Sequence, residues 1–211
     1  MSQHYFSAQP DAPHRPGQVR VILPDLYLEL ETDAGMFSPG RLDPGTRLLL
    51  DRAPAAPAAG DLLDLGCGYG PIACVLAARS PAATVWAVDV NERALELCAR
   101  NAARAGLANV RCVNVHGVGA SDANLPGTVD AIWSNPPIRI GKPALHELLR
   151  TWLSRLRGQA SLVVGRNLGA DSLAAWLDAQ GWPTVRLAAR SGYRLLSVQG
   201  SAGGSEYGDG S

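Results

Sequence analysis

Apolar and polar residues begin to alternate along the chain near residue 18, after a polar, proline-rich start. In the segment LYLELE, residues 26–31, each leucine is followed by a tyrosine or a glutamate, so an extended strand here has one apolar face. We predict a β-hairpin over residues 18–35. A short helix should follow it, with Asp43 as the N-cap and Pro44 at the first helical position.

From Asp61 onward, short apolar runs alternate with amphipathic segments. The apolar runs predict strands at residues 61–66, 84–90, 109–115, 129–134, 160–165, 184–190 and 193–199. The amphipathic segments predict helices at residues 71–80, 91–106, 143–158 and 169–181, the third of which should end at Gly158. Strands that alternate with helices form a mostly parallel sheet covered on both faces. The pattern therefore predicts an α/β fold with a seven-stranded sheet, whose last two strands form an antiparallel hairpin at one edge.

The length and composition suit one globular domain of 211 residues, of which 46% are apolar and 18% charged. We expect residues 1–17 to be irregular and residues 18–53 to form a hairpin and helix that pack on the main domain. Residues 54–199 should form the main domain itself. The Gly/Ser-rich residues 200–211 should be a disordered tail.

No apolar run approaches the ~20 residues that cross a membrane, and the N-terminus lacks the apolar region of a signal peptide. We therefore expect a cytoplasmic protein with no membrane partner. The four cysteines, Cys67, Cys74, Cys98 and Cys112, lack the spacing of metal ligands. We expect buried thiols and no metal site.

The net charge of zero argues against a protein that coats nucleic acid, but the charge is unevenly distributed. Residues 139–194 carry nine basic and three acidic side chains, whereas residues 1–138 carry 10 basic and 14 acidic ones. The basic segment could face phosphates or could consist of solvated helix faces, and its composition leaves both interpretations open.

A glycine-rich loop, DLGCGYG, ends the first strand of the α/β region and opens the next helix. Alternating glycines at positions 66, 68 and 70 let the backbone approach a ligand without clashes from Cβ atoms. Such a loop suits a dinucleotide or S-adenosylmethionine, and it can also be a plain tight turn. Asp89, at the end of the second strand, can accept hydrogen bonds from both ribose hydroxyls, which either ligand possesses. As a simple helix cap it would be redundant, since Asn91 fills that role.

The segment SNPPIR, at the end of the fourth strand, favours methyl transfer to an amino group. The lone pair of an aryl or amide-like amine is delocalised, so the nitrogen is a poor nucleophile. The side-chain oxygen of Asn135 and the carbonyl of Pro136 can bind its two N–H groups and point the lone pair at a methyl donor. Pro136 and Pro137 hold these acceptors still, and no strong general base is needed. The alternative is a simple strand terminator, because proline lacks an N–H for the sheet.

The combined motifs resemble those of the class I S-adenosylmethionine-dependent methyltransferases with an Asn-Pro-Pro motif. More narrowly, the chain resembles the catalytic domain of the small-subunit ribosomal RNA guanine-N2 methyltransferase C family and its single-domain relatives, over residues 4–198. The segments that carry the resemblance are HYFS (4–7), GMFSPGRLDPGTRLLL (35–50), DLGCGYG (64–70), VDVNERAL (88–95), SNPPIRIGK (134–142) and GYRLL (192–196). The resemblance implies a Rossmann-like class I methyltransferase fold for residues 54–199.

The resemblance also implies roles for individual residues. The methionine part of the cofactor would be lined by Asp64, Gly66, Gly68 and Gly70, and the ribose would be held by Asp89. Asn135 and Pro136, stiffened by Pro137, would hold the target amine, beside Ile138, Arg139 and Lys142 at the substrate. Residues 37–46 would lie near the methyl donor, where the Phe37 ring would face the sulfonium. Phe37 could equally be a plain core aromatic.

Two positions depart from the family pattern. Many relatives carry an acidic residue that meets the adenine amino group, where Val118 stands here; Asp122 could substitute for it, or the backbone alone could hold the adenine. Many amino-methyltransferases have an aromatic ring after Asn-Pro-Pro, where this chain has Ile138, which can contact a base only through apolar surface.

The resemblance leads to an enzyme that methylates an exocyclic amine, with guanine N2 in ribosomal RNA as the first hypothesis. Its partner would be ribosomal RNA or a ribosomal particle. Two alternatives remain at this point. One is methylation of another amine, in a DNA or RNA adenine, a protein glutamine or a small metabolite. The other is a non-catalytic RNA-binding relative.

Overall fold

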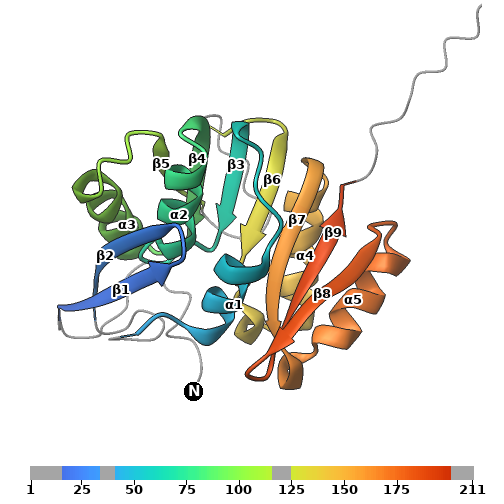
Figure 1. Ribbon diagram of the computed structural model, residues 1–211. Coiled ribbons are helices and arrows are strands. Elements are labelled where there is room, and N and C mark those ends of the chain that lie inside the picture. The colour runs from blue at the N-terminus through green and yellow to red at the C-terminus, as the bar shows by residue number, and fades with distance from the viewer. Residues whose placement is uncertain (1–15, 34–40, 116–124, 201–211) are drawn as a thin grey trace, which may run out of the picture.

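The computed structural model describes residues 16–33, 41–115 and 125–200. Its centre is a seven-stranded sheet in the order β5-β4-β3-β6-β7-β9-β8 (Figure 1). The strands are β3 (Ala59–Leu65), β4 (Ala82–Asp89), β5 (Val110–Asn114), β6 (Val129–Ser134), β7 (Leu156–Gly165), β8 (Thr184–Arg190) and β9 (Tyr193–Gln199). The strands from β5 to β7 are parallel, and β9 pairs antiparallel with both β7 and β8. This arrangement confirms the predicted α/β sheet with an antiparallel hairpin at one edge.

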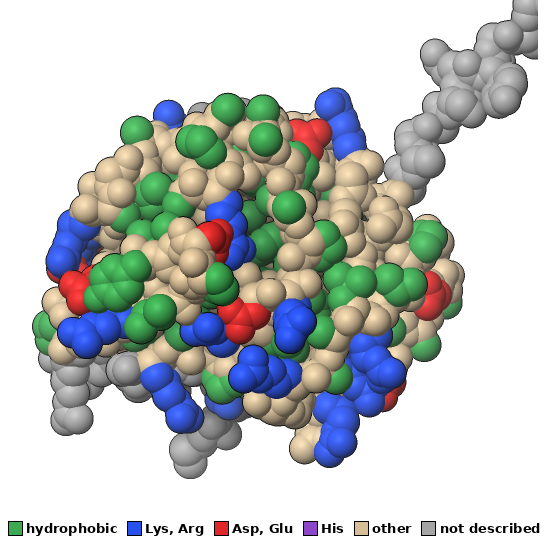
Figure 2. Space-filling model, in the orientation of Figure 1, with side chains coloured by type: hydrophobic (Ala, Val, Ile, Leu, Met, Phe, Trp, Pro, Cys, Tyr) green, Lys and Arg blue, Asp and Glu red, His purple; other side chains and the backbone are tan. Residues whose placement is uncertain are grey.

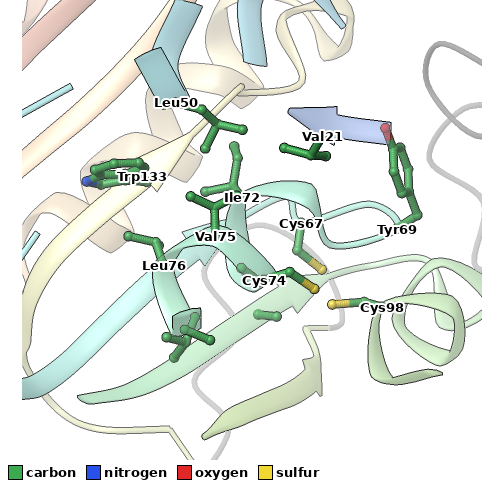
Figure 3. Close-up of a cluster of buried hydrophobic side chains, with 14 of the residues drawn as sticks. Val21, Leu50, Cys67, Tyr69, Ile72, Cys74, Val75, Leu76, Cys98 and Trp133 are labelled. Carbon is green, nitrogen blue, oxygen red and sulfur yellow. The ribbon is translucent and has the colours of Figure 1, made fainter. Parts of the chain in front are cut away.

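Helices cover both faces of the sheet and define two apolar cores. The helices are α1 (Pro44–Arg52), α2 (Pro71–Arg79), α3 (Glu92–Arg104), α4 (Lys142–Leu153) and α5 (Ala170–Ala179). Buried side chains of α1, α2 and α3 share one core, and those of α4 and α5 share the other. In the first core, Ile72 of α2 lies beside Leu50 of α1 and Val21, and Val75 lies next to Ile72 (Figure 3).

A two-stranded hairpin, β1 (Gly17–Leu23) and β2 (Leu26–Thr32), precedes the sheet and confirms the predicted hairpin. Its apolar face joins the first core. Asn101 of α3 fastens the hairpin to the glycine-rich loop: its Nδ2 donates to the carbonyl oxygens of Glu31 (2.9 Å) and Tyr69 (2.8 Å). Its Oδ1 accepts the Glu31 N–H at 2.7 Å. Within the described ranges, no helix is long and apolar enough to cross a membrane.

The prediction of a helix over residues 143–158 is wrong at its C-terminal end. Helix α4 ends at Leu153, and strand β7 begins at Leu156. The amphipathic pattern continues past Leu153, but Leu156 pairs with Val129 of β6, and this pairing makes the segment extended. Gly158, expected to end the helix, lies in the strand, where a Cβ atom would be 2.3 Å from the carbonyl oxygen of Asp130. Glycine is needed there for close backbone approach and not for a helix cap.

Candidate active site

Strands β3, β4 and β6 end at the same edge of the sheet and bring the sequence-predicted motifs together (Figure 1). The glycine-rich loop follows β3, Asp89 ends β4, and the Asn135–Pro137 turn follows β6. Ser134 joins two of these ends, because its Oγ donates to the carbonyl oxygen of Leu65 at 2.6 Å. A Cβ atom at Gly66 would lie 3.8 Å from Cδ of Pro137, so the loop and the turn face each other. Open α/β sheets bind ligands at this edge.

The glycines of the loop serve different purposes. Gly68 and Gly70 have φ angles of +55° and +91°, which disfavour any residue with a Cβ atom. Gly70 precedes α2 and is also tightly packed, since a Cβ there would be 2.5 Å from Sγ of Cys98. A Cβ atom at Gly68 would meet no described atom within 4 Å. Gly70 therefore fits the loop to α3, whereas Gly68 leaves one side of the loop open to a ligand.

Asp89 is oriented by two backbone amides. Its Oδ2 accepts the N–H of Gly68 at 2.9 Å, and its Oδ1 accepts the N–H of Asn91 at 3.0 Å. Burial raises the pKa of the Asp89 carboxyl above its ordinary value, although these hydrogen bonds favour the charged form. Each carboxylate oxygen keeps capacity for a further donor, as two ribose hydroxyls require. Asn91 caps α3 by accepting the Ala94 N–H, as predicted.

Asp64 lies beneath the loop, fully buried near the end of β3. Its Oδ2 accepts the N–H of Ala73 in the first turn of α2 at 2.8 Å. Its Oδ1 is buried and has no hydrogen-bond partner among the described residues. Burial raises the pKa of the Asp64 carboxyl to about 8. The Asp64 side chain thus binds the N-terminal turn of α2. Its contact with the methionine part of a cofactor stays a prediction.

The turn after β6 has a defined geometry. The strand ends at Ser134, as the two prolines predict. Pro137 has φ −75° and ψ 71°, and the Ile138 N–H donates to the Pro136 carbonyl at 2.8 Å. This is an inverse γ-turn, followed by one turn of 3₁₀ helix, η1 (Ile138–Ile140). The Pro136 carbonyl therefore has one of its two acceptor positions filled and one left for a ligand.

The amide of Asn135 is held by its amino end. Its Nδ2 donates to Oδ1 of Asp43 at 2.9 Å and to Oγ1 of Thr46 at 3.1 Å. Both N–H bonds are thus used, and the amide oxygen is left for another donor. Asp43 also caps α1 by accepting the Thr46 N–H at 2.9 Å, which confirms the predicted cap. The Tyr193 hydroxyl of β9 donates to Asp43 Oδ2 at 3.3 Å.

The resemblance placed residues 37–46 near the methyl donor and substrate, but sequence reasoning gave Asp43, Thr46 and Tyr193 no individual role in the site. Asp43 was identified as a helix cap, and all three residues lie in segments that carry the family resemblance. Those segments indicated that the residues belong to the family pattern, but they did not predict the hydrogen bonds between them. Burial and the charge of Asp43 raise the pKa of the Tyr193 hydroxyl, so it remains a donor at neutral pH.

The predicted substrate residues lie beside the turn. Ile138 is half-buried against the second core, while Arg139 and Lys142 are exposed. Figure 2 shows Lys and Arg side chains gathered along the lower edge of the molecule, the edge toward which β3 and β6 point in Figure 1. The basic segment is divided between two edges of the sheet, because Arg157 follows Leu156, which pairs with Val129 at the start of β6, far from the turn.

Cys67 of the loop, Cys74 and Cys98 are buried in the first core, as predicted (Figure 3). Cys112 of β5 is only partly buried, so the expectation of a buried thiol is wrong there. Burial raises the pKa of the Cys74 thiol to about 12, so it stays neutral. Phe37 and Val118, expected at the cofactor, lie outside the described residues, and their roles stay predictions.

Comparison with known proteins gives a family match across most of the chain. Residues 27–197 match the model of the methyltransferase small domain. The uncharacterized protein YbxB of Bacillus subtilis (strain 168) is 31% identical over 201 residues, which cover 94% of this chain and 99% of YbxB. Ribosomal RNA small subunit methyltransferase C of Pseudomonas aeruginosa (strain UCBPP-PA14) is 31% identical over 200 residues, or 92% of this chain and 58% of that protein.

Solved structures share the fold. The Thermus thermophilus 16S rRNA N2 G1207 methyltransferase RsmC, solved in complex with AdoMet and guanosine, superposes with a TM-score of 0.72 at 22% identity. The match covers 90% of this chain and 52% of that one. The chain thus spans about half the length of the methyltransferase C proteins that it matches.

Proposed function

The chain belongs to the methyltransferase small domain family, and from this premise we propose that it transfers a methyl group from S-adenosylmethionine to an exocyclic amine, N2 of guanine in ribosomal RNA. The observation that carries the proposal is the orientation of Asn135. Its amino end is bound to Asp43 and Thr46, which leaves its oxygen as an acceptor next to the glycine-rich loop. An acceptor of this kind at this edge can bind an N–H group of a target amine.

The residues at the sheet edge fit S-adenosylmethionine. Gly68 leaves one side of the loop open, and Asp89 offers two oriented carboxylate oxygens to a ribose. The buried Oδ1 of Asp64, which has no hydrogen-bond partner among the described residues, adds a polar atom beneath the loop. When bound, the cofactor supplies an electrophilic methyl group on a positively charged sulfur. The Asp89 carboxyl gives this part of the site two oriented acceptors for the ligand.

The turn after β6 positions the nucleophile. Asn135 Oδ1 and the free acceptor position of the Pro136 carbonyl each take one N–H of the target amine. With both protons held, the nitrogen lone pair points at the methyl group. Bound S-adenosylmethionine would supply the methyl group to this nitrogen, and the methylated amine would release a proton to water. The γ-turn at Pro137 fixes the Pro136 carbonyl, and Asp43 and Thr46 fix the Asn135 amide, so the two acceptors are oriented before the substrate binds.

Ribosomal RNA is the proposed substrate because several 30–38% identical relatives are named ribosomal RNA small subunit methyltransferase C. The exposed Arg139 and Lys142 beside Asn135 are suited to phosphates. These relatives are longer than the part that this chain matches, so their substrate is not carried over to it directly. The experiment below distinguishes guanine N2 in ribosomal RNA from other amines.

The test is product identification with [methyl-³H]S-adenosylmethionine. The purified protein is incubated separately with 16S rRNA, small ribosomal subunits, DNA, protein and a metabolite extract, and the labelled product is digested and separated. We expect label in N2-methylguanosine from RNA or subunits, and none with the Asn135→Ala protein. Label in N6-methyladenosine, methylglutamine or a small molecule would overturn the proposed target and keep the amine methyltransferase. Failure to bind the cofactor would overturn both.

A further inference from the structure

We propose that Asp43 is a positioning residue for methyl transfer, which fixes the Asn135 amide so that its oxygen, and not its amino group, faces the target amine. This inference rests on the proposed function, because it concerns the amine site described above. Asp43 lies 92 positions before Asn135 and meets it only in the folded protein, at 2.9 Å.

The need for such a residue follows from the chemistry of an amide. The two ends of an asparagine side chain are nearly equal in size, and rotation about its last bond is soft. One end accepts hydrogen bonds and the other donates them. If the amide of Asn135 turned over, its NH₂ group would face the N–H groups of the substrate amine. Catalysis therefore depends on a neighbour that accepts only one of the two orientations.

Asp43 is the neighbour that selects the orientation of the Asn135 amide. An ionised carboxylate accepts hydrogen bonds and cannot donate, so Asp43 binds only the amino end of Asn135. Thr46 also contacts this amino end, at 3.1 Å, but a hydroxyl can donate or accept and would tolerate either orientation. The selection between the two orientations thus comes from Asp43.

Asp43 is itself held rigidly. It is 5% exposed, and its carboxylate accepts from three donors: the Thr46 N–H, the Asn135 amide and the Tyr193 hydroxyl. These donors come from α1, the β6 turn and β9. The start of α1 is pressed against β9, since a Cβ atom at Gly45 would be 2.6 Å from the Tyr193 ring.

Capping alone does not explain an aspartate at this position. Asn and Ser cap helices about as well as Asp. The Thr46 N–H and the Asn135 amide share Oδ1 of Asp43, while Oδ2 faces the Tyr193 hydroxyl. An asparagine at position 43 would keep its oxygen toward the Thr46 N–H and its NH₂ group toward the Tyr193 hydroxyl, and it would lose the charge that strengthens the hydrogen bond from Asn135. The identity of the residue therefore matches the positioning task in addition to the cap.

The Asp43→Asn variant separates the two roles, because it keeps a helix-capping oxygen and removes the carboxylate charge that holds the amino end of Asn135. With [methyl-³H]S-adenosylmethionine and 16S rRNA, we expect kcat to fall about 10- to 100-fold, the effect of weakening one charge-assisted hydrogen bond. KM for RNA and Kd for the cofactor should change less than threefold. Asp51→Asn, at the other end of α1 and paired with Arg47, is the matched control and should retain wild-type kcat. Asp43→Ser, another capping variant, serves if Asp43→Asn does not fold.

A double-mutant cycle tests whether Asp43 acts through Asn135. In the Asn135→Ala background, Asp43→Asn should cause no further loss of kcat, because the group that it positions is gone. Multiplicative losses would overturn the proposal and assign Asp43 an independent role in stability or binding.

Nuclear magnetic resonance gives a readout that does not depend on activity. The side-chain ¹⁵NH₂ signals of Asn135 are identified by their absence in Asn135→Ala. They should be shifted and protected from exchange in the wild type, and should lose both properties in Asp43→Asn but not in Asp51→Asn. Unchanged signals in Asp43→Asn would overturn the positioning role. Changed signals in a protein that methylates no amine would instead contradict the proposed function.

Discussion

The amino end of the Asn135 side chain is bound to the Asp43 carboxylate and its oxygen is free. The partners of the amino end therefore determine that Asn135 offers an acceptor to the substrate. The same holds for Asp89, whose two oxygens are aligned by the amides of Gly68 and Asn91. At both positions the backbone or a buried partner fixes the polar side chain before any ligand arrives. Preorganisation of this kind lowers the cost of binding and of reaching the transition state.

Replacement of Asp89 by alanine should weaken cofactor binding. The loss of charge-assisted hydrogen bonds to the ribose is worth about 1.5–3 kcal/mol, or a 10- to 100-fold higher Kd for S-adenosylmethionine. Titration calorimetry on the purified protein measures this directly, with Asp61→Asn as a control on the same sheet. An unchanged Kd would exclude Asp89 from the ribose site.

The buried Asp64 carboxyl should make stability depend on pH. Its pKa is raised to about 8 in the folded protein, from an ordinary value of 3.8. Between these values the folded state holds a proton that the unfolded state has lost, so stability falls as pH rises through this window. The slope is at most ~1.4 kcal/mol per pH unit.

The measurement for Asp64 is the free energy of unfolding from pH 5 to pH 9 for the wild type and Asp64→Asn. The variant keeps an acceptor for Ala73 but has no charge to titrate. The wild type should therefore lose stability relative to Asp64→Asn as pH rises, and the difference should level off above pH 8. Parallel curves would contradict the account of this carboxyl.

Among the elements, the strand pattern was the most predictable feature. Strands β6, β8 and β9 have the bounds expected from the sequence, because prolines or a Ser-Gly turn interrupt the alternation at their ends. The boundary between α4 and β7 was not predictable, since the amphipathic pattern continues through it and only pairing with β6 ends the helix.

The sequence predicted the individual motifs of the site but not the hydrogen bonds between residues of different motifs. Local signals identified a cap at Asp43 and a rigid turn at Asn135, each for its own physical reason. Their contact requires that α1 lie over the end of β6, which depends on packing between distant segments. Tyr193 is a further example, because nothing near it in the sequence indicates a partner 150 positions away.

Two alanine variants of the glycine-rich loop should differ in whether they mainly reduce the stability of the fold or the affinity for the cofactor. Gly70→Ala places a Cβ atom 2.5 Å from the Cys98 sulfur at a φ of +91°, and should cost about 2–5 kcal/mol of stability. Gly68→Ala meets no described atom, so it should cost about 1–2 kcal/mol but should weaken cofactor binding more strongly. Urea unfolding and calorimetry measure the two effects, and the reverse ranking would contradict the assigned roles.

At the scale of the whole molecule, the proposed chemistry and the exposed positive charge share one edge of the sheet. Arg139 and Lys142 border the turn, whereas Arg157 lies near the opposite edge. If RNA phosphates contact the first two residues, Arg139→Ala and Lys142→Ala should each raise KM for 16S rRNA. Each should also reduce the salt dependence of log KM by about one unit of slope. Arg157→Ala is the control, and an equal effect there would contradict a localised RNA contact.

The central claim is that the oxygen of Asn135 aligns the target amine, and the kcat of Asn135→Ala measured beside its cofactor Kd tests it most directly. The variant should fold and bind S-adenosylmethionine like the wild type. Because the missing acceptor acts in the transition state, kcat with 16S rRNA should fall by about 10²–10³-fold. Asn135→Asp, which keeps an acceptor, should retain more activity than Asn135→Ala. A wild-type kcat in Asn135→Ala would reduce the Asn-Pro-Pro segment to a strand terminator and contradict the account.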